Sequence, residues 1–364
     1  MIYLDYQATT PLATEAREAM LKWLGGPGSG GFGNPHSAHR MGRQAAAAVE
    51  HAREQVAALL PPGGTLIFTS GATEALNTAL RGTTGDVLTF ATEHAAVLDC
   101  ARPVREEGRD FEILPVGAGG QADLDALSAA VAPDTGVVAA MLVNNEIGTI
   151  NPLADIAALA HAQDALVLCD AVQGYGRIAI TEGADFIAIS AHKIHGPKGI
   201  GALWIRGGAD LDPLMFGGGQ EQGLRSGTLS PALCAGFGAA AALAAERMEQ
   251  DGAHVAALWS RARELFQGWQ LNGSAEARWK GNLNIRRQGL DVARLMSDVR
   301  EVMFSAGSAC ASGSGRPSHV LRAIGLSDSE AKGSIRLGFG RYTTMEEIEQ
   351  AAAAIGAAAS EQGI

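Results

Sequence analysis

Lys193 is the residue whose surroundings in the sequence most clearly indicate a reactive side chain. It lies in the run Ser190 to Gly199, directly after the apolar stretch Phe186 to Ile189. An amine at the end of a buried strand, with His192 beside it, can be desolvated enough to lose its proton and attack an aldehyde. The sequence therefore indicates a Schiff-base lysine, although most lysines that follow strands are ordinary solvated side chains.

Asp170 is the partner that favours this interpretation. It closes the apolar run Leu166 to Cys169, where an ionised carboxylate is costly to bury unless a cation meets it. The protonated pyridine nitrogen of pyridoxal phosphate (PLP) is such a cation, and Asp170 and Lys193 on successive strands could grip its ring from two sides. Alone, Asp170 would be interpreted as a helix cap or turn residue. The pair predicts a PLP site.

Three further segments could complete such a site. The run Thr69 to Ala75 follows a strand and begins a helix, so its N–H groups and hydroxyls could cradle a phosphate, or simply cap the helix. Glu93 and His94 follow the strand Val87 to Phe90, where an imidazole could lie on a cofactor ring. Arg336, on a predicted strand, could hold a carboxylate through two parallel hydrogen bonds or form a structural salt bridge.

Cys310 lies in a run of small residues, from Phe304 to Gly315, with almost no apolar anchor. This composition predicts an exposed thiol on a flexible loop that could swing toward a bound substrate, whereas Cys169 should be inert core. The four cysteines are widely spaced and include no C-x-x-C pair. Neither a disulfide framework nor a zinc site is predicted, and no metal is expected.

The elements that must position these residues follow from the apolar pattern. Strand-length apolar runs alternate with alanine-rich helical stretches, which predicts a parallel sheet covered by helices. A helical tract over residues 232–267 would bridge to a smaller α+β unit. We expect a large domain of residues 13–250 and a small domain of residues 1–12 and 251–364 that carries the Cys310 loop.

Composition and targeting signals narrow the class of protein. The net charge of −11, without a block of Lys or Arg, argues against nucleic acid and anionic membranes as partners. The N-terminus lacks a basic stretch followed by an apolar run, and no segment is long enough to span a bilayer. We therefore expect a soluble, cytoplasmic protein. Gly28 to Gly33 matches G-x-G-x-x-G but follows a helical stretch, so a dinucleotide oxidoreductase ranks last.

Taken together, these runs resemble the PLP-dependent cysteine desulfurases of the NifS/IscS type, within the class V aminotransferase group. The resemblance covers nearly the whole chain and implies the fold type I of PLP-dependent transferases, with a mainly parallel seven-stranded sheet in the large domain. Its matching runs are Tyr3 to Thr10, Thr69 to Glu74, Asn144 to Gly148, Ser190 to Gly199, Arg225 to Thr228 and Gly307 to Cys310.

The resemblance also implies a role for individual residues. The cofactor ring would be held by Lys193 as a Schiff base, Asp170 at the pyridine nitrogen, Gln173 at the ring hydroxyl, and His94, which stacks on the ring and exchanges protons. The phosphate would be bound by Ala72, Thr73, Ser190 and His192. In a homodimer with shared sites, Thr228 would reach the phosphate of the neighbouring subunit. The substrate carboxylate would be held by Asn145 and Arg336, and its sulfur would pass to Cys310.

The activity that follows is conversion of L-cysteine to L-alanine, with the sulfur left on Cys310 as a persulfide. An acceptor protein, expected to serve iron–sulfur cluster assembly, would then take the sulfur. A class V aminotransferase or a selenocysteine lyase would use the same cofactor, and a non-catalytic protein could retain the fold. The chain ends soon after its last predicted helix, so we expect it to lack the C-terminal tail with which longer members meet their scaffold.

Overall fold

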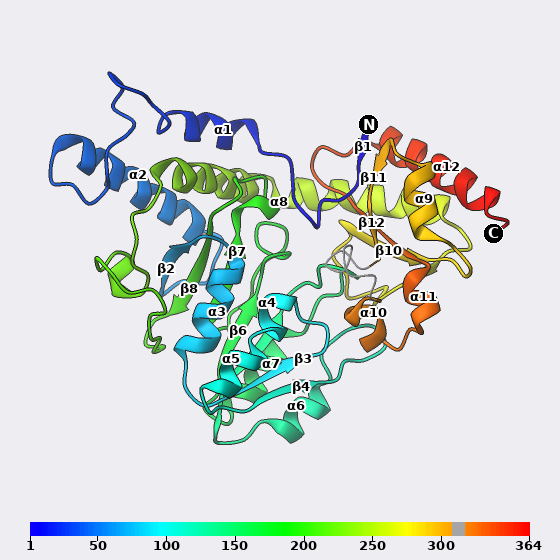
Figure 1. Ribbon diagram of the computed structural model, residues 1–364, viewed down its shortest axis with the longest axis horizontal. Helices are drawn as coiled ribbons and strands as arrows, with labels where there is room; N and C mark the ends of the chain where they lie inside the picture. The colour runs from blue at the N-terminus through cyan, green and yellow to red at the C-terminus, as the bar shows by residue number, and fades with distance from the viewer. Residues whose placement is uncertain (308–316) are drawn as a thin grey trace.

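The computed structural model describes residues 1–307 and 317–364. Its main feature is a seven-stranded sheet (Figure 1). In sheet order the strands are β2 (Gly64–Thr69), β8 (Gly201–Arg206), β7 (Phe186–Ser190), β6 (Leu166–Asp170), β5 (Thr135–Met141), β3 (Asp86–Phe90) and β4 (Phe111–Leu114). The strands from β7 to β4 run parallel, and β8 is antiparallel to both of its neighbours. The predicted mainly parallel, seven-stranded sheet is confirmed.

Both faces of this sheet are covered by helices, which explains why its central strands are apolar throughout. In β7, Phe186 and Ala188 pack into one hydrophobic cluster, and Ile187 and Ile189 pack into another on the opposite face. One face is covered by α3 (Ala72–Gly82), α4 (Ala95–Leu98) and α5 (Ala101–Glu106). The other is covered by α1 (Thr14–Leu21), α2 (Arg40–Ala57), α6 (Leu124–Ala130), α7 (Leu153–His161) and the first part of α8 (Pro231–Leu265).

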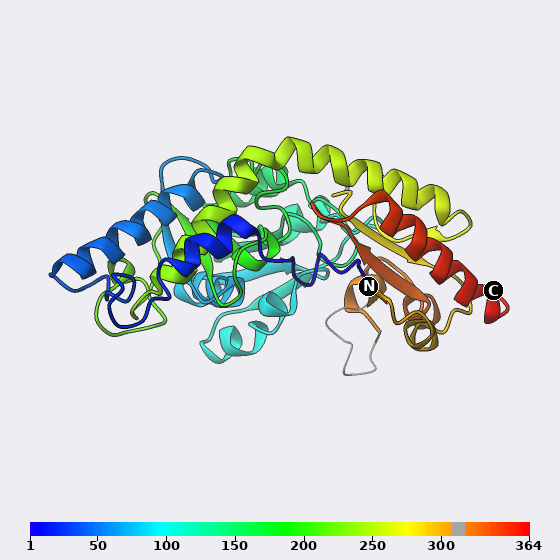
Figure 2. The ribbon, with the colours of Figure 1, turned by 90° about the horizontal axis from the view of Figure 1, so that it is seen from above.

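Helix α8 joins the two halves of the molecule, because its residues pack in the hydrophobic clusters of both. Its 35 residues begin with Pro231, a favoured first helical residue, after the N-cap Ser230. At 1.5 Å per residue the helix is about 50 Å long. Phe237 packs in the cluster beneath the large sheet, whereas Leu258 and Ala262 pack in the cluster of the second half. Figure 2 shows this helix extending over both halves.

The second half is built on a four-stranded antiparallel sheet and a two-stranded parallel pair. The sheet contains β12 (Ser305–Ala306), β13 (Ser334–Gly338), β10 (Asn282–Arg286) and β9 (Gln270–Leu271), and the pair contains β1 (Ile2–Tyr3) and β11 (Val302–Met303). The helices of this half are α9 (Val292–Asp298), α10 (His319–Ala323), α11 (Asp328–Lys332) and α12 (Met345–Glu361). Within the described ranges, no helix combines the length and apolar character needed to cross a membrane.

The first ten residues connect this second half to the large sheet. Beyond β1, the backbone N–H of Gly338 donates to the Leu4 carbonyl, and the Gln7 side chain donates to the Gly281 carbonyl. Three residues further, the N–H and hydroxyl of Thr10 both donate to the His192 carbonyl, beside Lys193. The N-terminal segment therefore lies between the second half and the end of β7.

Candidate active site

A cavity of about 480 Å³ lies where the parallel strands of the large sheet end. The strand register pairs Asp170, the last residue of β6, with Met141 at the end of β5 and Ala188 near the end of β7. Side chains that follow these strands therefore meet at one edge, where ligands bind in open α/β sheets. The residues predicted for the site that line the cavity are Ala72, Thr73, His94, Asn145, Asp170, Gln173, Ser190, His192, Lys193 and Arg336.

Two predicted site residues are not placed in this cavity. Thr228 lies in the segment between η2 (Glu221–Gly223) and α8 and is not among the described residues that line the cavity. Cys310 belongs to residues 308–316 and lies outside the described residues. Among the described residues, the cavity of one chain thus brings together the predicted cofactor and carboxylate-binding residues except Thr228.

Lys193 ends a short 3₁₀ helix, η1 (Ala191–Lys193), that directly follows β7. Its Nζ atom donates to the backbone carbonyl of Gln7 at 2.5 Å and to that of Ala8 at 2.9 Å. Both acceptors are neutral, so these contacts hold the amine in place without stabilising its charge as a carboxylate would. Lys193 is therefore an oriented amine that is easily deprotonated.

The electrostatic surroundings of Lys193 strengthen this conclusion. Burial is the main cause that lowers its pKa from 10.5 to about 8, and the positive charges of Arg177 and Arg336 lower it further. The negative charges of Asp170 and Asp5 act in the opposite direction. A neutral amine is the form that attacks a carbonyl carbon, so the site produces this form near physiological pH.

Asp170 is a buried carboxylate at the edge of the cavity. One of its oxygens accepts a hydrogen bond from the Val172 N–H at 3.0 Å, and within the described chain it forms no salt bridge with Lys or Arg. Burial raises its pKa, and the positive charges of His94 and Lys193 oppose this rise. Such a carboxylate is best stabilised by a cation inside the cavity, which is the property expected of a partner for a pyridinium nitrogen.

Glu93 lies beside this carboxylate and received no role from the sequence. It is fully buried, and its Oε1 atom accepts a hydrogen bond from the Met141 N–H at 2.7 Å. Its Oε2 atom is buried without a hydrogen-bond partner among the described residues. Burial and the negative charge of Asp170 raise the pKa of Glu93 well above its ordinary value. Burial and the neighbouring acid therefore favour the neutral form of Glu93.

His94 is fixed by its position at the start of α4. Its Nδ1 atom accepts a hydrogen bond from the Ala96 N–H at 3.0 Å, so the imidazole caps this short helix. Because Nδ1 uses its lone pair in this contact, the neutral ring carries its proton on Nε2. The ring is part of the cavity wall, and it can exchange a proton there only through Nε2.

The start of α3 forms another part of the cavity wall. Ala72 and Thr73 are its first residues, and no described side chain caps this helix end. Its free N–H groups and the helix dipole favour an anion. His192 lines the same cavity, and burial together with nearby positive charges lowers its pKa to about 4. A neutral His192 can donate a hydrogen bond to a phosphate without adding charge.

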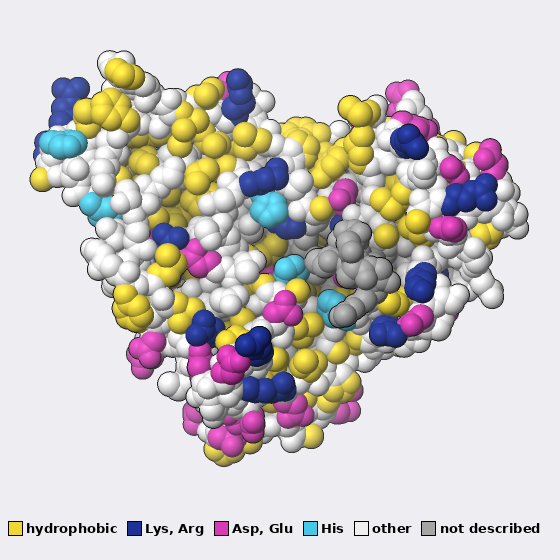
Figure 3. Space-filling view, in the orientation of Figure 1, with side chains coloured by type: hydrophobic (Ala, Val, Ile, Leu, Met, Phe, Trp, Pro, Cys, Tyr) yellow, Lys and Arg dark blue, Asp and Glu magenta, His cyan; other side chains and the backbone are white. Residues whose placement is uncertain are grey.

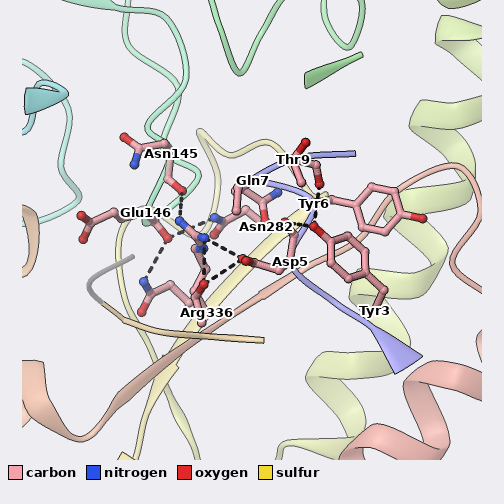
Figure 4. A network of polar contacts seen from close by, with 12 residues as sticks. Tyr3, Asp5, Tyr6, Gln7, Thr9, Asn145, Glu146, Asn282 and Arg336 are labelled. Atoms are coloured by element: carbon pink, nitrogen blue, oxygen red, sulfur yellow. Dashed lines mark hydrogen bonds and ion pairs between the residues drawn. The ribbon is translucent and has the colours of Figure 1, made fainter. Parts of the chain in front are cut away.

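Arg336 lies on β13 and is almost fully buried (1 % exposed). Figure 4 shows its guanidinium between Asn145 and Asp5, where it donates to the Asn145 carbonyl at 3.0 Å and to the Asp5 carboxylate at 2.7 Å. It also donates to the Ser305 hydroxyl at 3.2 Å, and its Nε atom has no partner among the described residues. Arg336 is thus a cavity-lining cation held in place by a salt bridge, which combines the two roles considered from the sequence.

Several residues of the site could not be found from sequence reasoning. Asp5 and Gln7 come from the N-terminal segment, and their contacts with Arg336 and Lys193 span most of the chain. The sequence identified that segment as a matching run but offered no local signal for either role. Arg177 likewise has no pattern around it that indicates its contact with Gln173.

Together, the sheet order and the lysine–aspartate cavity define an α/β enzyme with the PLP-dependent transferase fold. The chain belongs to the class V aminotransferase family, whose model (Aminotransferase class-V) matches residues 2–351. It is 43% identical over 96% of its length to a probable mitochondrial cysteine desulfurase of Schizosaccharomyces pombe, covering 72% of that protein. It is 41% identical over 96% of its length to the cysteine desulfurase IscS of Rickettsia rickettsii, covering 89% of that protein.

A solved structure of a NifS-like protein has the same architecture. It superposes with a TM-score of 0.91 at 31% sequence identity, and the match covers 99% of both chains. The predicted fold class and family are therefore confirmed.

Proposed function

We propose that this chain is a PLP-dependent cysteine desulfurase, which converts L-cysteine to L-alanine and passes the sulfur to a protein acceptor. One observation carries the proposal: Lys193, with a pKa lowered to about 8, lines the same cavity as the buried carboxylate of Asp170. The chain is 41–43% identical to proteins named cysteine desulfurase, which supports L-cysteine as the substrate.

The residues of the cavity fit PLP. Asp170 offers a buried negative charge for the pyridine nitrogen, Lys193 offers an amine for the aldehyde, and Gln173 offers an amide N–H for the ring hydroxyl. The phosphate would be bound by the start of α3 (Ala72 and Thr73) with Ser190 and His192. When bound, the cofactor supplies an electron sink for the carbon next to the substrate amine.

The chain's own residues would then bind the amino acid and move its protons. Arg336 and Asn145 bind the carboxylate and orient the substrate within the cavity. The neutral Lys193 amine accepts the proton from the substrate Cα, and His94 exchanges protons through Nε2. This assignment uses each group in the protonation state that its surroundings favour.

Sulfur transfer is assigned to Cys310. Its thiolate attacks the substrate sulfur, the carbon–sulfur bond breaks, and its electron pair stays with the carbon fragment, which takes up a proton and leaves as alanine. The transferred sulfur remains on Cys310 as a persulfide and passes to the acceptor. Cytoplasmic location and delivery to iron–sulfur cluster assembly rest on the family resemblance.

We further infer a homodimer in which the partner subunit's Thr228 completes the phosphate site. The observation that favours this arrangement is that Thr228 does not line the cavity of its own chain within the described residues. Exposed apolar side chains lie in two segments of the chain: Leu24 (63 % exposed) and Phe32 (60 %) between α1 and α2, and Phe216 (82 %) between β8 and η2. Figure 3 shows hydrophobic side chains gathered over the end that carries α1 and α2. Such a patch is typical of an interface.

A Cys310→Ser variant tests the sulfur-transfer step. We expect release of sulfide and alanine from L-cysteine to fall at least about a hundredfold, because serine cannot accept the sulfur, while the yellow absorption of bound PLP is retained. Assays of alanine and sulfide, with mass spectrometry of the peptide that contains Cys310, provide the measurement.

Cys100→Ser is the matched control for this variant. Cys100 is buried at the start of α5, its thiol contacts the Ala96 carbonyl at 3.3 Å, and a serine hydroxyl can make the same contact. It should retain activity and PLP. Undiminished alanine formation in Cys310→Ser would contradict sulfur transfer through Cys310 and favour the selenocysteine lyase alternative, whereas loss of the amino group without sulfide release would favour an aminotransferase.

A further inference from the structure

Arg177 connects Gln173 to the loop that carries Lys193. Its Nη1 atom donates to the Gln173 Oε1 atom at 2.5 Å, and its Nη2 atom donates to the Lys193 backbone carbonyl at 2.7 Å. Longer contacts join it to the Tyr6 carbonyl at 3.5 Å and to the Trp279 ring, whose centroid lies 5.9 Å from the guanidinium carbon. One side chain thus contacts two residues expected to bind the cofactor.

The charge of Arg177 is not paired with an acid. In the part of the chain that the structure describes, its polar contacts are backbone carbonyls and the Gln173 amide. It lines a small cavity of about 30 Å³ together with Lys193 and Asp251. The Asp251 carboxylate already pairs with Arg341 at 2.6 Å and with Arg247 at 3.3 Å. Burial lowers the pKa of Arg177 to about 10, so the residue is still a cation at neutral pH.

We propose that Arg177 is a positioning residue of this active site: it fixes the orientation of the Gln173 amide toward the cofactor hydroxyl and holds an unpaired positive charge behind the Lys193 amine. The proposal deepens the function proposed above and rests on it. Arg177 is not among the residues expected to contact the cofactor or the substrate, and the proposal gives it an indirect role through Gln173 and Lys193.

The first part follows from hydrogen-bond polarity. An amide has one acceptor oxygen and one donor nitrogen, and a guanidinium can only donate. Arg177 therefore fixes the Gln173 oxygen on its own side, and the Gln173 Nε2 atom donates to the Gln7 carbonyl at 2.9 Å. Because Gln173 lines the cavity, the second N–H of Nε2 is the group that it can offer to a ligand. A ring hydroxyl that has lost its proton needs such a donor.

The second part follows from charge. The charges that act on Lys193 are those of Arg177 and Arg336, which favour the neutral amine, and those of Asp170 and Asp5, which favour the ammonium. Arg336 is already paired with Asp5 at 2.7 Å, so part of its field is cancelled. Arg177 has no such partner among the described residues, and its field therefore opposes protonation of Lys193 with little compensation.

The test measures the pKa of Lys193 directly in apo-protein made by removing PLP. Competitive acetylation across a pH series, read by mass spectrometry of the peptide that contains Lys193, gives this value independently of catalysis. We expect Arg177→Met to raise the Lys193 pKa by about one unit, because the unpaired positive charge is lost. Arg177→Lys keeps a charge and should leave the Lys193 pKa near its wild-type value.

A second readout separates the orienting role from the charge. In the holoenzyme, the absorption spectrum of bound PLP and its pH dependence report on the ring hydroxyl. We expect this spectrum to change in both Arg177→Met and Arg177→Lys, because an ammonium group cannot make the paired contacts to Gln173 and to the Lys193 loop. If Arg177 only supported the fold, its replacement would not selectively change the Lys193 pKa or the PLP spectrum.

Arg278→Met is the matched control. Arg278 is also a buried guanidinium that donates to backbone carbonyls, those of Ser274, Asn282 and Asn272, and burial lowers its pKa to about 10. It has no contact with Gln173 or Lys193 among the described residues, so its loss should change neither readout.

The outcomes are distinct. An unchanged Lys193 pKa in folded Arg177→Met, or an equal change in Arg278→Met, would overturn the inference. Arg177→Gln serves the same purpose if the methionine variant does not fold, as checked by circular dichroism. Wild-type protein that forms no alanine from L-cysteine would refute the proposed function while leaving the Lys193 measurement valid.

Discussion

At the scale of single residues, the site depends on groups whose charge is set by their surroundings. Lys193 is held by two neutral carbonyls, and Asp170 has no salt bridge with Lys or Arg in the described part of the chain. Burial beside Asp170 raises the pKa of Glu93 well above its ordinary value. The chain thus places a buried amine with a lowered pKa and a buried carboxyl group where an aldehyde-bearing, cationic ring would need them.

The depressed pKa of Lys193 predicts a pH dependence for cofactor uptake. Only the neutral amine attacks the aldehyde, and its pKa is lowered from 10.5 to about 8. The rate at which apo-protein takes up PLP should therefore rise with pH and level off above about pH 8, rather than rising until about pH 10.5 as for an ordinary lysine. Stopped-flow absorbance measures this rate. A rate of PLP uptake that continues to rise beyond pH 9 would show that the pKa of Lys193 is not lowered.

Sequence reasoning proposed residues that lie on or near recognisable strand and helix ends, and it gave no role to residues without such a pattern around them. Lys193, Asp170 and His94 each follow an apolar run that identifies a strand. Asp5 lies in a segment without such a pattern, and its partner Arg336 is 331 residues away. Arg177 also has no such pattern around it, although its partners Gln173 and Lys193 lie within 16 residues. The contact between Asp5 and Arg336 joins residues at opposite ends of the chain.

At the scale of elements, the apolar runs predicted β3, β6, β7 and the long helix α8 to within a few residues. The strand β4 was not predicted, because only Phe111 and Leu114 of its four residues are buried and the apolar pattern is therefore short. The antiparallel direction of β8 was also not predicted, because the run Gly201–Arg206 is as apolar as the strands that run parallel to one another in the same sheet. Strand direction depends on the connection and not on the residues of the strand.

The segment around η2 is joined to the large sheet by one buried carboxylate. Glu221 accepts two hydrogen bonds from Arg53 on α2, at 2.8 Å each, and a third from the Phe68 N–H on β2. Its φ of 48° is in the left-handed region, a cost that these contacts offset. The carboxylate is 3 % exposed, whereas Glu50, the other acid beside Arg53, is 63 % exposed.

This contrast predicts unequal effects of two similar substitutions. Glu221→Ala should lower the free energy of unfolding by about 3 kcal/mol, because it leaves the Arg53 charge and the Phe68 N–H without their buried partner. Glu50→Ala removes an exposed partner of the same arginine and should cost less than about 0.5 kcal/mol. Urea denaturation followed by circular dichroism compares them. Equal effects would show that the buried carboxylate contributes no more than its exposed neighbour.

At the scale of the whole molecule, the exposed apolar residues predict self-association. We expect sedimentation equilibrium to give twice the chain mass of 37.5 kDa. Phe216→Asp places a charge at an 82 % exposed phenylalanine and should weaken the dimer at least about tenfold. Ile113→Asp is the matched control, because Ile113 is also exposed (47 %) but lies on β4 at the edge of the sheet. A wild-type monomer, or equal weakening by both substitutions, would contradict this prediction.

The position of the first ten residues has a consequence for biosynthesis. Ile2 and Tyr3 pair with β11, Leu4 bonds with Gly338, and the Gln7 carbonyl receives the Lys193 amine. These residues are synthesised well before their partners on β11 and β13, which lie about 300 residues later in the chain. The nascent chain can form the central sheet during translation, but the N-terminal segment that holds the Lys193 amine has its partners only after residues 302–338 have been made. A truncated product would therefore hold this amine poorly.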